Sequence, residues 1–597
     1  MDRSSLARVA LIGVALLLFW FYGLPLLQGK TDKPQAVPPE VYASAPDFVP
    51  DAIDDPPGQP TEGTLCKIKG NRFDAELSTR GAALVHFFLR DPQYAGTDGL
   101  DLGSVTVWTS APGSTVPDHE RWRSLRTLFR GDKGKDQLQY DRFNWKLDPS
   151  DGSSCRFTYD DADVSIVKTI SVGQRPFELD VETTLTNLDD ATKHHQFSIE
   201  AFAYRQTKDV KGGFMKRASP FVTELSCARG KDVTRKSKDD FKGGWFSEPL
   251  VDRYAAVSNS YFGQAIVPSA SPAEVKPECD LLAEDWFTNE KDHGKGEDLS
   301  GAVYHARLLY PSVELAPKES ATYKQTAFFG PKERDVLAKA GGGQVGLSDL
   351  INLGFFSPVA KVLVGILVFF HAHVTFGSWG LAIIAMTLCL RVLLIPLSIK
   401  PVKTAIAMRR LKPEIDIVSA KFKDDAQAKN MAMMELYRKH GVNPLGGCLP
   451  QLVQMPIWFA MYTTLQTAVE MYHEKFLWFT DLSAPDRIFV LPLVLGAFMI
   501  LQQRIVPQQG MDPVQAKMMM YLLPLFFTAM MLFLPAALGV YMLTNSVLGI
   551  TQQLVVEKIA PRGGGKAAKG EIKVRPAAKD DGAPVRNGAF GKGKASV

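Results

Sequence analysis

The longest uncharged stretch constrains the fold of this chain most. From Met518 to Val556, 39 consecutive residues include no Asp, Glu, Lys or Arg. As one helix they would extend about 58 Å at ~1.5 Å per residue, nearly twice the ~30 Å hydrocarbon thickness of a bilayer. We therefore expect two membrane-spanning helices. The break is predicted at Leu534-Pro535-Ala536, because proline removes a backbone donor and clashes with the preceding turn.

Other apolar segments complete the predicted membrane region. Residues 1–28 begin with two arginines and continue as an apolar run, which predicts an uncleaved N-terminal transmembrane anchor. A further helix is expected at 378–398, and residues 448–556 should hold four, giving six spans. The apolar piece 355–370 is short and contains a lysine, so we assign 337–377 to a glycine linker and an amphipathic helix in the outer membrane interface.

Two basic segments predict the orientation. Residues 399–447 carry ten Lys or Arg against five acids, and the tail 557–597 carries ten against four. The positive-inside rule therefore places both segments and the N-terminus in the cytoplasm. The first segment reads as a helical hairpin broken near Lys423-Asp424-Asp425. It could bind anionic lipid, a ribosome or a targeting factor, or it could merely fix topology; the candidate contact residues are Arg409, Arg410, Lys412, Lys421, Arg438 and Lys439.

The region between the anchor and the other spans has a different pattern. Residues 29–61 are proline-rich and predict an extended linker. In 62–336, alternation of apolar and polar residues, clearest at 177–185, predicts one large exported antiparallel β-sandwich. The net charge of +4 is too small to argue for nucleic acid.

Four cysteines in this region would meet an oxidising compartment. Three pairings are possible, and the spacing does not choose among them; they are Cys66, Cys155, Cys227 and Cys279. No cysteine, histidine or carboxylate spacing indicates a metal site, and no nucleophile elbow, phosphate loop or paired catalytic acids are found. The glycines at 341–346 follow no strand and indicate a hinge. We expect neither a cofactor nor catalysis.

Arg391 is the only charge in the span 378–398. An arginine stays protonated and is costly at the bilayer centre, so its presence indicates function, unless it snorkels to the inner headgroups. Thr387 and Ser398 share its helical stripe. Possible partners on other spans complete a hydrophilic groove that opens to the cytoplasmic half of the membrane; they are Gln451, Gln454, Tyr541, Thr544 and Asn545. Sixteen of the 18 methionines lie between Met386 and Met542, which is typical of an adaptable apolar binding flank; the alternative for any single methionine is ordinary lipid-facing or core packing.

Several motifs resemble the YidC/Oxa/Alb family of bacterial membrane protein insertases. They are Pro396-Leu397, the basic hairpin, Asn443-Pro444-Leu445-Gly446-Gly447-Cys448-Leu449-Pro450, Gln454-Met455-Pro456, Asp481-Leu482-Ser483 and Asp512-Pro513. More weakly, Thr79-Arg80-Gly81-Ala82 and Phe329-Gly330-Pro331 resemble the periplasmic domain of Gram-negative members, a supersandwich similar to galactose mutarotase.

The resemblance implies a multi-domain membrane protein of the Gram-negative inner membrane, with a five-helix core, an N-terminal anchor and a periplasmic β-supersandwich. It implies insertion and folding of nascent membrane proteins through a groove containing Arg391, Thr387 and Tyr541, without ATP. Implied partners are the Sec translocon (SecYEG, SecDF), the ribosome and the signal recognition particle pathway. The alternatives are a secondary transporter and a membrane-tethered carbohydrate-binding or epimerase-like protein.

Overall fold

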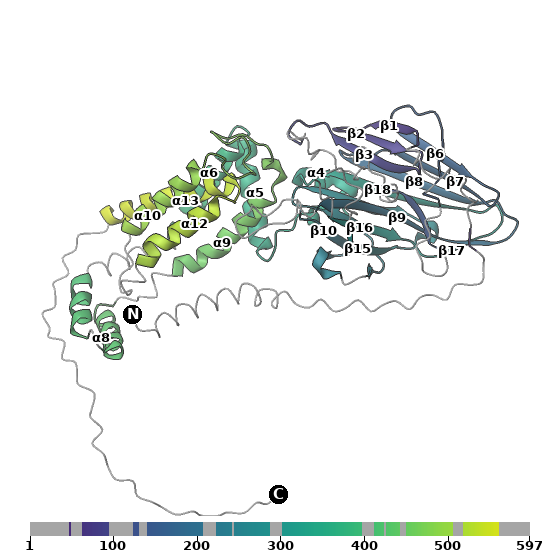
Figure 1. Cartoon of the computed structure of the whole chain (residues 1–597). Coiled ribbons are helices and arrows are strands. Elements are labelled where there is room, and N and C mark those ends of the chain that lie inside the picture. The colour runs from purple at the N-terminus through teal and green to yellow at the C-terminus, as the bar shows by residue number, and fades with distance from the viewer. Residues whose placement is uncertain are drawn as a thin grey trace, which may run out of the picture.

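The computed structural model consists of a β-rich domain followed by a bundle of helices, which lie at opposite sides of Figure 1 with α4 and α5 between them. It describes residues 47–48, 63–94, 123–130, 140–141, 143–206, 222–241, 244–286, 301–396, 411–422, 425–441, 449–505 and 517–559. The predicted anchor, the proline-rich linker apart from 47–48, and the C-terminal tail beyond 559 lie outside the described residues.

The β-rich domain contains three antiparallel sheets. A three-stranded sheet has the order β1-β2-β3, and a nine-stranded sheet has the order β11-β10-β13-β14-β18-β8-β7-β6-β5. The third sheet has the order β12-β15-β16-β9-β17, with β4 also paired to β9. The strands are β1 Leu65–Lys69, β2 Phe73–Ser78, β3 Ala83–Leu89, β4 Thr127–Arg130, β5 Lys146–Leu147, β6 Ser154–Asp160, β7 Val164–Val172, β8 Glu178–Asn187, β9 Lys193–Gln206, β10 Glu224–Arg229, β11 Asp232–Lys236, β12 Phe246–Glu248, β13 Tyr254–Ser258, β14 Phe262–Ala270, β15 Glu278–Trp286, β16 Gly301–Leu309, β17 Val313–Leu315 and β18 Ser320–Pro331.

The alternation of apolar and polar residues in the sequence matches the alternation of buried and more exposed side chains along these strands. In β8, inward and outward positions alternate along most of the strand, and its partners β7 and β18 pair with it in antiparallel register. The inward side chains join one apolar core that includes Leu179, Val181 and Leu185. The predicted antiparallel β domain is therefore confirmed.

Two disulfides connect the sheets. Cys66 of β1 is bonded to Cys155 of β6, and Cys227 of β10 to Cys279 of β15. The first bond joins the three-stranded sheet to the nine-stranded sheet, and the second joins the nine-stranded sheet to the third sheet. The structure thus selects one of the three pairings that the spacing left open.

The Thr79-Arg80-Gly81-Ala82 segment forms a tight turn between β2 and β3. Gly81 and Ala82 both have positive φ, at 68° and 49°. A Cβ at Gly81 would lie 2.6 Å from the carbonyl oxygen of Asp141, so only glycine fits. This motif therefore has a packing explanation.

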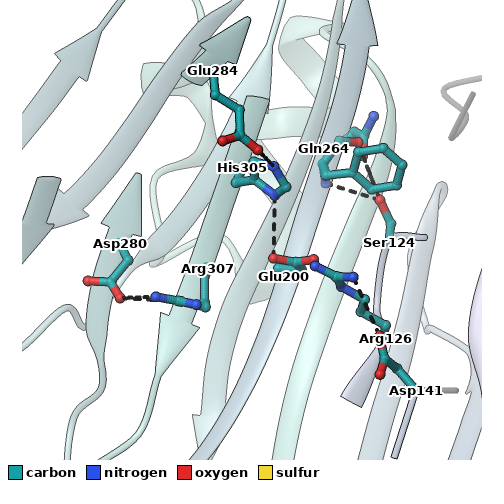
Figure 2. Close-up of polar contacts among 10 residues, drawn as sticks. Ser124, Arg126, Asp141, Glu200, Gln264, Asp280, Glu284, His305 and Arg307 are labelled. Carbon is teal, nitrogen blue, oxygen red and sulfur yellow. Dashed lines mark hydrogen bonds and ion pairs between the residues drawn. The ribbon is translucent and has the colours of Figure 1, made fainter. Parts of the chain in front are cut away.

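Charged side chains are buried in pairs on one face of the third sheet (Figure 2). Arg307 of β16 donates to Asp280 of β15 at 2.8 Å, and Arg126 is bonded to Glu200 of β9. Burial alone would raise the pKa of Glu200, but the positive charge of Arg126 lowers it to about 2. His305 lies between Glu200 and Glu284, at 3.6 and 3.7 Å.

The second half of the chain is helical. A short segment of α4 Arg334–Lys339, η6 Ala340–Gly342 and η7 Leu347–Leu350 leads from β18 to the bundle. The bundle contains α5 Ser357–His373, α6 Trp379–Leu393, α9 Leu449–Gln466, η9 Val469–Met471, α10 Val490–Ile505, a π-helical turn Met518–Leu522, α12 Leu523–Met531 and α13 Ala536–Ile559. Outside the bundle, the described residues include the 3₁₀ turns η3 Lys238–Asp240 and η4 Pro272–Glu274 in the β domain. They also include the helical residues 411–421 and the charged helix α8 Ala426–Lys439.

The predicted break in the uncharged stretch is confirmed. α12 ends at Met531 and α13 begins at Ala536, directly after Pro535. Among the helices of the described residues, none is both long and apolar enough to cross a membrane. The six-span topology therefore stays a prediction.

The glycines at 341–346, which the sequence predicts as a hinge before the membrane region, are hydrogen-bonded to the sandwich. The backbone N–H of Gly341 donates to the Glu178 carboxylate at 2.7 Å, and Arg253 donates to the carbonyl oxygens of Val345 and Gly346. Positive φ angles at four of these glycines allow the chain to turn while it stays hydrogen-bonded to the sandwich. The segment is therefore attached to the sandwich, because arginine and carboxylate side chains far away in the sequence form hydrogen bonds with its backbone.

Candidate functional site

The candidate site lies where α6, α9 and α13 meet. α6 begins at an N-cap, Ser378, whose hydroxyl accepts from the Leu381 N–H, and it presents Arg391 near its C-terminal end. The Nε of Arg391 donates to Oδ1 of Asn545 at 2.7 Å, and an Nη donates to the Asn545 backbone oxygen at 2.8 Å. One amide residue of α13 therefore holds the guanidinium by two bonds.

Asn545 also links the third helix to this cluster. Its Oδ1 accepts a second hydrogen bond from Nε2 of Gln454 on α9, at 3.3 Å. Arg391, Gln454 and Asn545 are each half-buried. The structure thus brings together three of the predicted site residues, one from each helix.

The charge of Arg391 is not neutralised within this cluster. Among the described residues, no carboxylate forms an ion pair with Arg391, whose hydrogen bonds go to a neutral amide and a carbonyl. Tyr541, one helical turn before Asn545, is 2% exposed and belongs to the apolar core of the bundle. A cation held by neutral groups keeps a net attraction for an acidic or polar ligand.

The two predicted site threonines, Thr387 and Thr544, do not bind Arg391 in the structure. The Thr387 hydroxyl donates to the Ile383 carbonyl at 2.6 Å, and the Thr544 hydroxyl donates to the Val540 carbonyl at 2.7 Å. Thr387 is 1% exposed. Both hydroxyls are therefore bonded within their own helices instead of joining the Arg391 cluster.

Some predicted site residues cannot be placed in the cluster. Gln451 lies on α9, one turn before Gln454, but its side chain is outside the described residues, as are Ser398, Arg409 and Arg410. The other four hairpin cations, Lys412, Lys421, Arg438 and Lys439, are exposed. They lie on the helical residues 411–421 and on α8, which pack together through a small apolar core that includes Leu411, Ile415 and Leu436.

Two residues beside the guanidinium were missed in the sequence. A Cβ added to Gly549 of α13 would lie 3.2 Å from an Arg391 Nη and 3.6 Å from Nε2 of Gln502 on α10. Gly549 thus makes room for the guanidinium, and Gln502 adds another amide near it. Gln502 could have been found as a polar residue within an apolar helix, and Gly549 by its position four residues after Asn545.

The fold and site together define a protein with a β-sandwich domain and a helical part that carries a half-buried arginine. The family model described as "60Kd inner membrane protein" matches residues 369–562, and the model described as "YidC periplasmic domain" matches residues 65–366. The chain belongs to the YidC family, and its sandwich corresponds to the periplasmic domain of that family.

Curated relatives cover most of the chain. It is 33% identical over 503 residues to the membrane protein insertase YidC of Anaeromyxobacter dehalogenans (strain 2CP-C), covering 82% of this chain and 85% of that protein. It is 30% identical over 570 residues to the membrane protein insertase YidC of Geotalea daltonii, covering 94% and 100%. A solved structure of an active YidC insertase, with its first transmembrane domain resolved, covers 92% of this chain and 98% of that chain, at 17% identity and a TM-score of 0.34. The family assignment therefore depends on the sequence relatives.

Proposed function

We propose that this chain inserts nascent proteins into the inner membrane, and that Arg391 marks the path of their polar segments. The observation that carries the proposal is the set of partners around Arg391: its hydrogen bonds go to Asn545, and Gln454 shares the same amide oxygen. Relatives that cover most of the chain are named membrane protein insertases. The charge is held in place and stays available to a substrate.

The mechanism lowers the cost of moving polar polypeptide through lipid. Each unsatisfied backbone or side-chain polar group costs several kcal/mol in the hydrocarbon region. A hydrophilic groove beside Arg391 would offer hydrogen-bond partners and a positive charge over half of the membrane. The apolar, methionine-rich flank would receive the substrate helix, and its partitioning into lipid would supply the free energy.

The finer topology belongs to the same proposal. Six spans with both termini in the cytoplasm would place the basic hairpin inside, where its exposed cations can contact anionic lipid, the ribosome or the signal recognition particle pathway. Four of these cations are exposed on the described helices. The Sec translocon would act beside the groove for substrates with large exported parts.

The charge of Arg391 is tested by inserting a single-span substrate with an acidic N-terminal tail. Replacing Arg391 with Ala should lower its insertion about tenfold, because ~1.4 kcal/mol of charge attraction is lost. Replacing Arg391 with Lys should retain most of the activity. Protection of the exported tail from protease in reconstituted vesicles measures the yield.

The matched control is Arg504→Ala, which removes an exposed arginine at the end of α10. It should leave insertion unchanged. Unchanged insertion in Arg391→Ala, at equal protein level, would contradict a required charge at this position.

A further inference from the structure

The turn after α9 belongs to two cores at once. Val469 and Tyr472 are buried in the core of the sandwich, whereas Ala468 and Met471 are buried in the core of the helical bundle. These residues are neighbours in η9 and its flanks. The short turn therefore joins the two parts of the molecule by direct packing.

Glu470, in the middle of this turn, is bound by the sandwich side of the junction. Its carboxylate accepts from the Arg334 guanidinium at 2.6 Å and from the Arg334 backbone N–H at 3.2 Å. Each of the two side chains is 16% exposed. The bonds thus lie in a partly dehydrated setting, where a charge-assisted pair is stronger than on an open surface.

A second set of bonds fixes the backbone of the same turn. Nε2 of Gln93 donates to the Glu470 carbonyl at 3.1 Å, and Nδ1 of His473 lies 3.0 Å from the Gln93 carbonyl. Gln93 follows the three-stranded sheet and is 377 residues from Glu470 in the sequence. The turn is therefore held from two separate segments of the β domain.

Tyr472 packs its ring against three aromatic side chains of the sandwich. Its ring centroid is 5.3 Å from that of Tyr261, 6.0 Å from that of Phe262 and 6.5 Å from that of Tyr94. Tyr472 is 5% exposed. Burying an aromatic side chain in this way supplies much of the energy of an interface.

Further hydrogen bonds within the β domain fix the sandwich side of the junction. Glu333, next to Arg334, accepts two bonds from the Arg72 guanidinium at 2.7 and 3.0 Å and one from the Tyr94 hydroxyl at 2.7 Å. Arg72 also pairs with Asp91. Arg334 and Tyr94 are thus presented to the turn by a network of the β domain.

The same loop continues to the start of α13. Asp481 of the Asp481-Leu482-Ser483 motif accepts from the N–H groups of His473 and Ser483, at 3.1 and 2.8 Å. The carbonyl oxygens of Leu482 and Ala484 then accept from the first N–H groups of α13, at 2.9 and 2.8 Å. The loop between α9 and α10 therefore supports the first turn of α13.

The helices that carry Gln454 and Asn545 consequently both meet this loop: α9 leads into it and α13 begins on it. We infer that Glu470 and Arg334 are positioning residues, through which the β domain sets the spacing of α9 and α13 around Arg391. This inference rests on the proposed function of the Arg391 cluster and adds the β domain to it. It assigns the exported domain a mechanical role at the groove.

Spin labels on α9 and α13 test the spacing without any insertion assay. Met455 and Val547 are exposed neighbours of Gln454 and Asn545. We would label Met455→Cys and Val547→Cys in the full-length protein, with Cys389 and Cys448 replaced by serine, and measure the distance distribution by pulsed electron paramagnetic resonance. Glu470→Ala should broaden or shift the distribution, and the charge swap Glu470→Arg with Arg334→Glu should restore it.

Asp335→Ala is the matched control, because it removes one exposed acid from α4 without touching the ion pair. It should leave the distance distribution unchanged. An unchanged distribution in both Glu470→Ala and Arg334→Ala would overturn the inference, whatever Arg391 does.

Insertion in combined variants tests the link to Arg391. Glu470→Ala and Arg334→Ala should each lower insertion of the acidic-tail substrate about fivefold. In an Arg391→Ala background Glu470→Ala should have little further effect, because both act through one cluster. A purely structural role would add its full effect in that background and would overturn the positioning inference.

The two hypotheses fail in different ways. If Arg391→Ala leaves insertion unchanged, the proposed function of the cluster fails, while the distance measurement still decides whether Glu470 sets the helix spacing. If the spacing changes in Glu470→Ala but insertion does not, and Arg391→Ala is defective, the link between junction and groove is wrong.

Discussion

Arginines are buried in the sandwich and half-buried in the bundle, and they have different partners in the two parts. In the sandwich, Arg307 is paired with Asp280 and Arg126 with Glu200, and these side chains are at most 8% exposed. In the bundle, Arg391 is bonded to the amide and backbone oxygens of Asn545. The first arrangement cancels charge, whereas the second orients it without cancelling it.

Buried lysines in the sandwich show a third arrangement. Lys168 is fully buried, and its ammonium donates to Leu125 and Thr127 oxygens; Lys332 donates to the Leu350 carbonyl. Burial lowers the pKa of Lys168 to about 7 and that of Lys332 to about 8. Lysines with neutral partners can therefore lose their charge, but an arginine cannot. A permanent cation beside neutral amides is the arrangement suited to attract a ligand.

The largest expected effect is on stability, and it distinguishes the ion-paired arginines of the sandwich from Arg391 of the bundle. Replacing Arg307 with Leu should lower the free energy of unfolding by about 3 to 5 kcal/mol, because the buried Asp280 carboxylate would lose its positive partner and keep the neutral Ser247 hydroxyl. The double variant Arg307→Leu, Asp280→Leu should recover most of the loss. Thermal unfolding of the full-length protein in detergent measures both changes.

Arg391→Leu should destabilise the protein less than Arg307→Leu, since no buried carboxylate is left behind. If the two single variants cost the same, or if the double variant is no more stable than Arg307→Leu, the contrast between paired and unpaired cations is wrong.

A smaller effect is expected from adding the missing negative charge to the bundle. Asn545→Asp keeps the size of the side chain but places a carboxylate 2.7 Å from Nε of Arg391. The resulting ion pair should reduce insertion of an acidic-tail substrate about tenfold, equivalent to ~1.4 kcal/mol, with the protein still folded. The assay is the same protease protection of the exported tail.

Asn545→Gln keeps the amide and is the control for altered packing. Full activity in Asn545→Asp would mean that a free positive charge is not needed.

The smallest effect concerns the buried lysines. Between pH 7 and pH 9 the unfolded state keeps the Lys168 proton, because its ordinary pKa is 10.5, whereas the folded state loses it above about pH 7. Unfolding therefore takes up a proton, and the free energy of unfolding should rise with pH by on the order of 1 kcal/mol. Lys168→Met should weaken this rise in stability, which the melting temperature at each pH measures.

Lys324→Met serves as the control, because Lys324 is about half exposed and pairs with Glu182 at the surface. A pH dependence identical in wild type and Lys168→Met would contradict a neutral Lys168 in the folded protein.

The sequence predicted the parts of the site that stand out chemically. Arg391 is a rare charge in an apolar segment, and amides on other apolar segments were natural partners. The break at Pro535 and the β pattern were predictable because they depend on local backbone chemistry and on a period of two. Which amide binds Arg391 was not predictable, since this depends on helix packing and side-chain rotamers.

Long-range contacts account for most of what the sequence missed. The disulfide partners Cys66 and Cys155 are 89 residues apart, and the spacing alone allowed other pairings. Arg334 begins α4 and Glu470 lies in the turn after α9, and neither carries a local signal of its partner. The hydrogen bonds from Glu178 and Arg253 to the backbone at 341–346 likewise have no local sequence signal.

The docking of Tyr472 and Glu470 also gives the protein an order of assembly. Arg334 precedes Glu470 by 136 residues, so at ~5 to 20 residues per second the ribosome completes the receiving surface roughly 7 to 27 seconds before the turn that fills it. During that interval Tyr94, Tyr261 and Phe262 cannot yet pack against Tyr472. A newly made chain can therefore form this junction only once Tyr472 has been synthesised, whereas α10, α12 and α13 follow Tyr472 in the chain.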